Sequence, residues 1–189
     1  MLRVADVPPT PWRNGAGETR VLLEWPRSPE WLVRISVARV PAGTSTFSSF
    51  PGVDRLITVV RGDPVRLTTE GQQPVELSAS ARELHFFSGD IPTTAHAGAQ
   101  GCEDLNIMAR RGAVRVQTAW IGQRRESATA ALGAFLRTPA QFSAGGAGPI
   151  AVPGMALLWW PNPGREKRVL ELTTPEAEGY WIEAEQPGE

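Results

Sequence analysis

Glycine and proline interrupt this chain at short intervals, and that spacing constrains the fold more than any other feature. The 189 residues include 19 glycines and 17 prolines. Between them lie short runs rich in β-branched residues, such as 19–25, 32–40, 54–61 and 167–173. Short runs bounded by turn residues are typical of β-strands, and their regular recurrence is typical of a sandwich or barrel. The sequence therefore predicts an all-β protein with little helix.

One segment departs from this pattern. Residues 124–137 (RRESATAALGAFLR) are rich in alanine, and Ser127 is placed as an N-cap, so they form the only helix that the sequence predicts. The same stretch also fits a linker followed by a strand at 132–137. Residues 141–149 are expected to form a loop.

The composition limits the partners and the compartment. The formal net charge is −1 and no basic block occurs, so neither nucleic acid nor an anionic membrane is an expected partner. No apolar run is long enough to span a bilayer, and the first residues lack the apolar centre of a signal peptide. Cys102 is the only cysteine, so we expect a packed side chain and a cytoplasmic location.

Few residues offer catalytic chemistry. The two histidines, His85 and His96, lack the spacing of metal ligands, and neither a nucleophile elbow nor a phosphate-binding loop occurs. Glu103 and Asp104 are adjacent in a predicted strand, so they should face opposite ways and cannot form a close dyad. The sequence therefore predicts no metal, no other cofactor and no catalytic residue.

Cations and amides on predicted strands are the remaining polar signal. Arg34 and Ser36 share one face of the run at 32–40, while Asp104, Asn106, Met108 and Arg110 share one face at 103–110. Such a face lies either toward solvent or on the floor of a cavity. The planar fork of arginine suits a carboxylate, so an arginine that faces a cavity needs a carboxylate either from the protein or from a ligand.

The densest motif is PWRNGAGETR at 11–20. Asn14 precedes Gly15 as a turn dipeptide, and its side chain can bond its own loop or a bound polar group. The alternative is a hairpin-entry turn with Trp12 buried beside it.

Four blocks together resemble the HutD/Ves family. PWRNGAGETR is similar to the family's PWKNGGGxT opening, and LVRISVARV is similar to its WRxSxA strand. TFSSFPGVDRLITVVRG resembles FSxFPGxDRxLxxLxG, and HFFSGDIPTTAHAGAQGCEDLNIMARRG resembles the block that ends in DLNxMxRR. The blocks occur in family order between residues 11 and 112. Arg13 stands where the family has lysine, Ala16 where it has glycine, and Leu32-Val33 where it has tryptophan.

The resemblance implies a cupin-like (RmlC-like) double barrel, in which two β-barrel or jelly-roll motifs are fused, with residues 1–189 as one bicupin domain. It also implies a pocket without the metal-binding histidines of catalytic cupins. Family members are associated with histidine utilisation, where a regulatory role and a ligand such as formylglutamate or urocanate have been proposed. Position by position, it implies the ligand-binding residues Asn14, Arg34, Ser36, Phe50, Arg55, Asn106 and Met108, of which Arg55 is the strongest candidate.

Three functions remain open. The first is a metal-free binding protein for a small anionic metabolite, and the second is a cupin-type isomerase or hydrolase that acts on a small carboxylate. The third is a structural or partner-binding protein, with Trp159 and Trp160 as an exposed interface for a homodimer. The missing acid–base dyad favours the binding protein over the enzyme.

Overall fold

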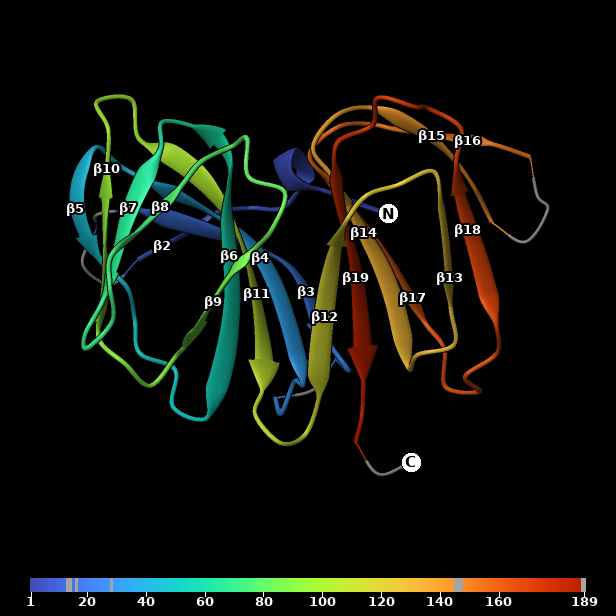
Figure 1. Cartoon of the computed structure of the whole chain (residues 1–189), viewed down its shortest axis with the longest axis horizontal. Helices are drawn as coiled ribbons and strands as arrows, with labels where there is room; N and C mark the ends of the chain where they lie inside the picture. The colour runs from blue at the N-terminus through green and yellow to red at the C-terminus, as the bar shows by residue number, and fades with distance from the viewer. Residues whose placement is uncertain (13–14, 16, 28, 145–147, 188–189) are drawn as a thin grey trace. The chain divides into compact units, whose positions relative to one another are not determined.

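The computed structural model describes residues 1–12, 15, 17–27, 29–144 and 148–187 (Figure 1). Among them, the only regular element that is not a strand is a single turn of 3₁₀ helix, η1 (Val4–Asp6). The prediction of an all-β fold with little helix is therefore confirmed. No helix in this part of the chain is long and apolar enough to cross a bilayer.

The chain divides into two compact units. One unit comprises residues 8–113, and the other comprises residues 1–7 together with 114–189. The described strands form two sheets in each unit, and all neighbouring strands pair antiparallel.

The unit of residues 8–113 has a six-stranded and a four-stranded sheet. The larger sheet has the order β2 (Thr10–Pro11), β3 (Glu18–Trp25), β4 (Val33–Val40), β11 (Cys102–Arg110), β6 (Val53–Gly62) and β9 (His85–Ser88). The smaller sheet has the order β5 (Gly43–Thr46), β10 (Thr93–Ala97), β7 (Val65–Thr69) and β8 (Val75–Leu77). Apolar side chains from both sheets meet in one core, among them Ile57 and Phe87 of the larger sheet and Leu67 and Ala95 of the smaller one.

Cys102 lies in that core. Its side chain is 5% exposed and forms no disulfide. Burial, together with the nearby carboxylates of Asp104, Glu103 and Asp63, raises the pKa of the thiol to about 12. The structure thus places Cys102 as a packed side chain, as the sequence predicts.

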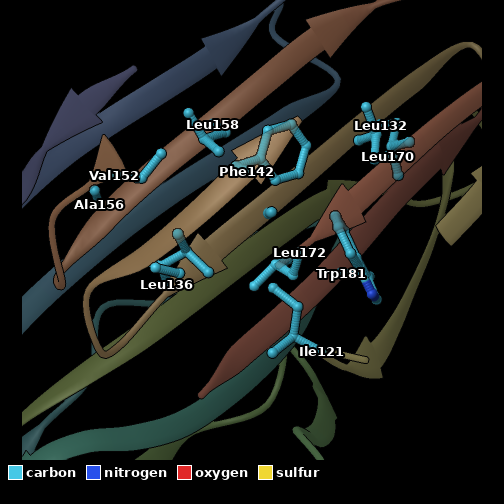
Figure 2. Close-up of a cluster of buried hydrophobic side chains, with 12 residues drawn as sticks. Ile121, Leu132, Leu136, Phe142, Val152, Ala156, Leu158, Leu170, Leu172 and Trp181 are labelled. Carbon is cyan, nitrogen blue, oxygen red and sulfur yellow. The ribbon is translucent and has the colours of Figure 1, made fainter. Parts of the chain in front are cut away.

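The second unit has a five-stranded and a four-stranded sheet. The larger sheet has the order β1 (Leu2–Arg3), β17 (Ala156–Pro161), β14 (Ala131–Leu136), β19 (Gly179–Glu185) and β12 (Arg115–Trp120). The smaller sheet has the order β13 (Arg124–Ser127), β18 (Arg168–Leu172), β15 (Ala140–Ala144) and β16 (Ile150–Val152). Figure 2 shows side chains from both sheets, including Leu132, Phe142, Leu158, Leu170 and Trp181, gathered in a single apolar cluster.

The predicted helix at 124–137 is wrong. The segment forms the two strands β13 and β14, which agrees with the alternative of a linker followed by a strand. All six residues of β14 are buried, and Gly133 lies against the indole of Trp159, where a Cβ would come within 2.5 Å of a ring carbon. The small residues are therefore demanded by packing in the sheet, which overrides their helical propensity.

The structure differs locally from the sequence-based expectations. Strand β15 occupies the start of the predicted loop at 141–149, and strand β10, with the sequence TTAHA, was not predicted. Trp159 and Trp160 are both half-buried rather than exposed. The ring of Trp160 stacks on Phe142 at 5.1 Å and packs against the apolar cluster of its unit.

Candidate ligand-binding site

A cavity of about 240 Å³ lies within the unit of residues 8–113. Its walls come from strands β2, β3, β4, β6 and β11, from Trp12 and from the segment 46–50, which begins at the last residue of β5. Arg34, Ser36 and Ala38 of β4 face it, next to Asp104, Asn106 and Met108 of β11.

Strand register explains why these side chains meet. On β4 and β11, Arg34 pairs with Met108, Ser36 with Asn106 and Ala38 with Asp104. On the other side of β11, Arg55 of β6 also pairs with Met108. Because alternate residues of a strand share one face, the three neighbouring strands present one polar patch to the cavity.

Arg55 is a buried cation at the cavity wall. It is 4% exposed, and its Nη1 donates to the carbonyl of Ser48 at 3.4 Å. The guanidinium carbon lies 4.7, 5.1 and 5.7 Å from the ring centroids of Phe87, Phe47 and Phe50. Burial lowers the pKa of Arg55 to about 10, against the opposing effect of Asp104, so the side chain stays charged at neutral pH. No acceptor among the described residues bonds its Nε.

Arg34 supplies a second cation. Its Nε lies 3.4 Å from Oε1 of Glu24, an ion pair whose geometry does not make a hydrogen bond. The guanidinium carbon lies 5.9 Å from the ring centroid of Phe50. Phe50 therefore contacts both guanidinium groups, and a backbone hydrogen bond from Phe50 N to Gly89 O, at 2.8 Å, fixes its position.

Two acceptors on β11 complete the polar patch. Asp104 is 4% exposed and Asn106 is 5% exposed, and within the described ranges neither Oδ1 atom has a hydrogen-bond partner. Burial raises the pKa of Asp104 to about 7, although the charge of Arg55 acts in the opposite direction. Unpartnered buried polar atoms are costly, and they are typical of sites that a ligand completes.

The structure brings together most of the residues that the sequence predicts for binding. Those that line the cavity are Arg34, Ser36, Phe50, Arg55, Asn106 and Met108. Asn14 lies outside the described residues. Trp12, from the same motif, lines the cavity and donates from Nε1 to Thr19 Oγ1 at 2.8 Å.

Sequence reasoning missed Asp104 as a site residue. Its alternation with Asn106 and Met108 was the available signal, but alternation does not reveal burial. Arg110, on the same predicted face, is not in the cavity wall; it donates from Nε to the carbonyl of Trp31 at 3.3 Å.

The described residues offer little to a metal. No group of three or more His, Cys, Asp or Glu side chains that could hold an ion occurs in the described ranges. His85 is half-buried, lies outside the cavity wall and is stacked with Phe87 at 6.2 Å. Burial lowers its pKa.

Fold and site together define a cupin-like protein whose polar cavity is built from arginines, amides and one carboxyl group. The HutD family model matches residues 4–163, and the chain belongs to the HutD family. Protein Ves from Citrobacter koseri is 40% identical over 113 residues, which cover 57% of this chain and 56% of that protein. An uncharacterised 21.2 kDa protein in the hutC 3′ region of Pseudomonas putida is 31% identical over 124 residues, 64% of this chain and 63% of that protein. The matches thus span less than two thirds of these relatives.

Solved structures share the fold. The structure of HutD from Pseudomonas fluorescens SBW25, in a formate condition, superposes with a TM-score of 0.82 at 22% identity, covering 99% of this chain and 98% of that one. A conserved protein of unknown function from Pseudomonas aeruginosa PAO1 superposes with a TM-score of 0.84 at 24% sequence identity, covering 98% of this chain and 97% of that one. A variant of oxalate decarboxylase from Bacillus subtilis superposes with a TM-score of 0.64 at 8% sequence identity, covering 97% of this chain and 76% of that one. The cupin-like fold that the resemblance implies is confirmed.

Proposed function

We propose that this protein is a metal-free receptor for a small carboxylate metabolite and regulates histidine utilisation in the cytoplasm. The ligand is of the formylglutamate or urocanate type, and nucleic acid and membranes are not partners. The observation that carries the proposal is the pair of arginines, Arg34 and Arg55, that face one cavity, where a buried N–H of Arg55 has no acceptor in the part of the chain that the structure describes. The membership in the HutD family and the position of the P. putida relative in the hutC 3′ region support the metabolic setting.

The chemistry of the cavity suits a carboxylate. Two guanidinium groups supply charge and paired N–H donors, Ser36 and Asn106 supply neutral polar groups, and Phe50 and Met108 supply apolar wall. An anion in this place would satisfy the N–H of Arg55 and offset the mutual repulsion of the two cations, which itself lowers the pKa of Arg55.

Ligand screening by thermal unfolding tests the proposal. Formylglutamate, urocanate, histidine, glutamate and formate are compared, and a ligand at 100 times its dissociation constant should add about 2.7 kcal/mol of stability. In R55K, we expect binding at least about tenfold weaker, because an ammonium cannot offer two parallel donors to a carboxylate. The melting temperature without ligand should change little, since the cation among the phenylalanine rings is kept.

R61K is the matched control. Arg61 lies on the same strand, its side chain is 65% exposed, and it pairs with Glu103 rather than facing the cavity. R61K should bind like the unmodified protein. Absence of a thermal shift with all of these compounds, in folded protein, would contradict the receptor, while a large stability loss in unliganded R55K would make Arg55 a structural residue.

One observation favours the enzyme as a second candidate. Asp104 is buried in the cavity with a pKa of about 7, which suits a general base at neutral pH. NMR spectra of the bound compound over hours discriminate the two functions: an enzyme converts it, with loss of conversion in D104N, whereas a receptor leaves it unchanged.

A further inference from the structure

Strand β11 places a carboxyl group in the same cavity as the two arginines. Asp104 is 4% exposed, and no donor among the described residues reaches its Oδ1. A buried carboxylate without donors is costly, so the environment of Asp104 disfavours its charged form unless the cations compensate.

The charged groups around Asp104 are few. Arg55 faces it from β6, and Arg34 lies in the same cavity from β4, with Glu24 of β3 beside Arg34. Cys102 on its own strand is the further titratable group whose pKa reflects Asp104, and its thiol is neutral at neutral pH. In the described cavity wall, Arg34, Arg55 and Asp104 are the titratable residues.

A ligand carboxylate changes this balance. It would pair with Arg34 and with Arg55, the cation that offsets the charge of Asp104, and it would bring a second negative charge into a small buried space. Two carboxylates in one small buried space repel each other, and this repulsion raises the pKa of one of them. A protonated Asp104 can moreover donate a hydrogen bond to a ligand oxygen.

We propose that Asp104 is a ligand-binding residue that takes up a proton as the ligand binds, so that a carboxylate and a proton enter the cavity together. This inference rests on the proposed receptor function. The proton comes from solvent, adds to the Asp104 carboxylate, and is released again when the ligand leaves.

Proton uptake by Asp104 makes ligand affinity fall as the pH rises above 7. The free protein holds Asp104 with a pKa of about 7, and a bound anion raises that pKa further. Below pH 7, Asp104 already carries its proton and affinity should be flat. Above it, the proton must be taken up, and affinity should fall by up to about tenfold for each pH unit.

Titration calorimetry with formylglutamate measures the coupling, because this probe does not itself titrate between pH 6 and 9. At pH 8, in two buffers of different ionisation enthalpy, the unmodified protein should take up nearly one proton per ligand. D104N should bind with no uptake and with a dissociation constant that does not change over this range. E103Q is the matched control, because Glu103 is the neighbouring acid on β11 and pairs with Arg61 instead; it should retain the uptake.

Binding without proton uptake in the unmodified protein, or undiminished uptake in D104N, would overturn the coupling and leave the receptor standing. Absence of binding at every pH would overturn both. Should D104N fail to fold, the slope of affinity against pH in the unmodified protein decides alone, since a flat profile from pH 6 to 9 contradicts the proposal.

Discussion

Phe50 holds the two cations of the cavity in place. Its ring centroid lies 5.9 Å from the guanidinium carbon of Arg34 and 5.7 Å from that of Arg55. Each such contact contributes about 0.5–1 kcal/mol at exposed sites and more where water is excluded. Phe50 is itself tied to Gly89 by a backbone hydrogen bond, which fixes the ring against both arginines.

Replacement of this ring should therefore weaken binding without removing a charge. We expect F50L to raise the dissociation constant about tenfold, because leucine fills most of the space but lacks the electron-rich ring face. Calorimetry with the ligand found by thermal screening measures the effect. F86L serves as control, since Phe86 is 57% exposed and outside the cavity wall; equal affinities of F50L and F86L would contradict this role.

At the scale of single residues, period-two alternation and the family blocks together indicated Arg34, Ser36, Asn106 and Met108. They could not separate a cavity floor from a solvent face, because that depends on what covers the strand. Asp104 is an example: the same alternation places it on this face, yet its burial beside Arg55 in the cavity wall depends on segments distant in sequence.

At the scale of elements, strand β14 depends on close approach by its neighbours. Gly179 of β19 pairs with Leu136, and a Cβ at Gly179 would lie 2.1 Å from the carbonyl oxygen of Phe135. A contact that short forces the two strands apart, because both partners are backbone. The segment 124–137 is predicted as a helix for a related reason. Its alanines favour a helix by propensity, but in the structure the small side chains let neighbouring strands pack closely.

G179A should therefore lower the free energy of unfolding by about 2–3 kcal/mol. Urea unfolding monitored by tryptophan fluorescence measures it. G122A is the comparison, since a Cβ there meets nothing within 4 Å and Gly122 is exposed, and its effect should stay within about 0.5 kcal/mol. A loss in G179A no larger than that in G122A would contradict the strand-approach argument.

At the scale of the molecule, each unit has two antiparallel sheets, but the side chains between the sheets differ in polarity. The unit of residues 8–113 carries the polar cavity, whereas the cluster in the other unit is filled by apolar side chains such as Phe142 and Trp181 (Figure 2). The sequence motifs that resemble the family lie between residues 11 and 112, so they predict only the unit of residues 8–113. The strands after residue 122 had to be inferred from apolar runs alone, and the errors at β13–β15 concentrate there.

A core change in the filled unit should leave the cavity's chemistry intact. Phe142 is 1% exposed, and F142L should cost about 1–2 kcal/mol and lower the melting temperature by a few degrees. The dissociation constant, measured well below that temperature, should stay within twofold of the original. A larger change in affinity would mean that ligand recognition depends on the packing around Phe142.

The burial of the single thiol has a practical consequence. Cys102 lies 5% exposed within one core, and its high pKa keeps it protonated, so alkylating reagents meet an inert group in the closed state. Labelling then proceeds only as fast as the surrounding strands separate, and with one cysteine in the sequence every labelled molecule reports the same event. The rate at which Cys102 is alkylated, followed by mass spectrometry, therefore measures how often this core opens, without an introduced probe.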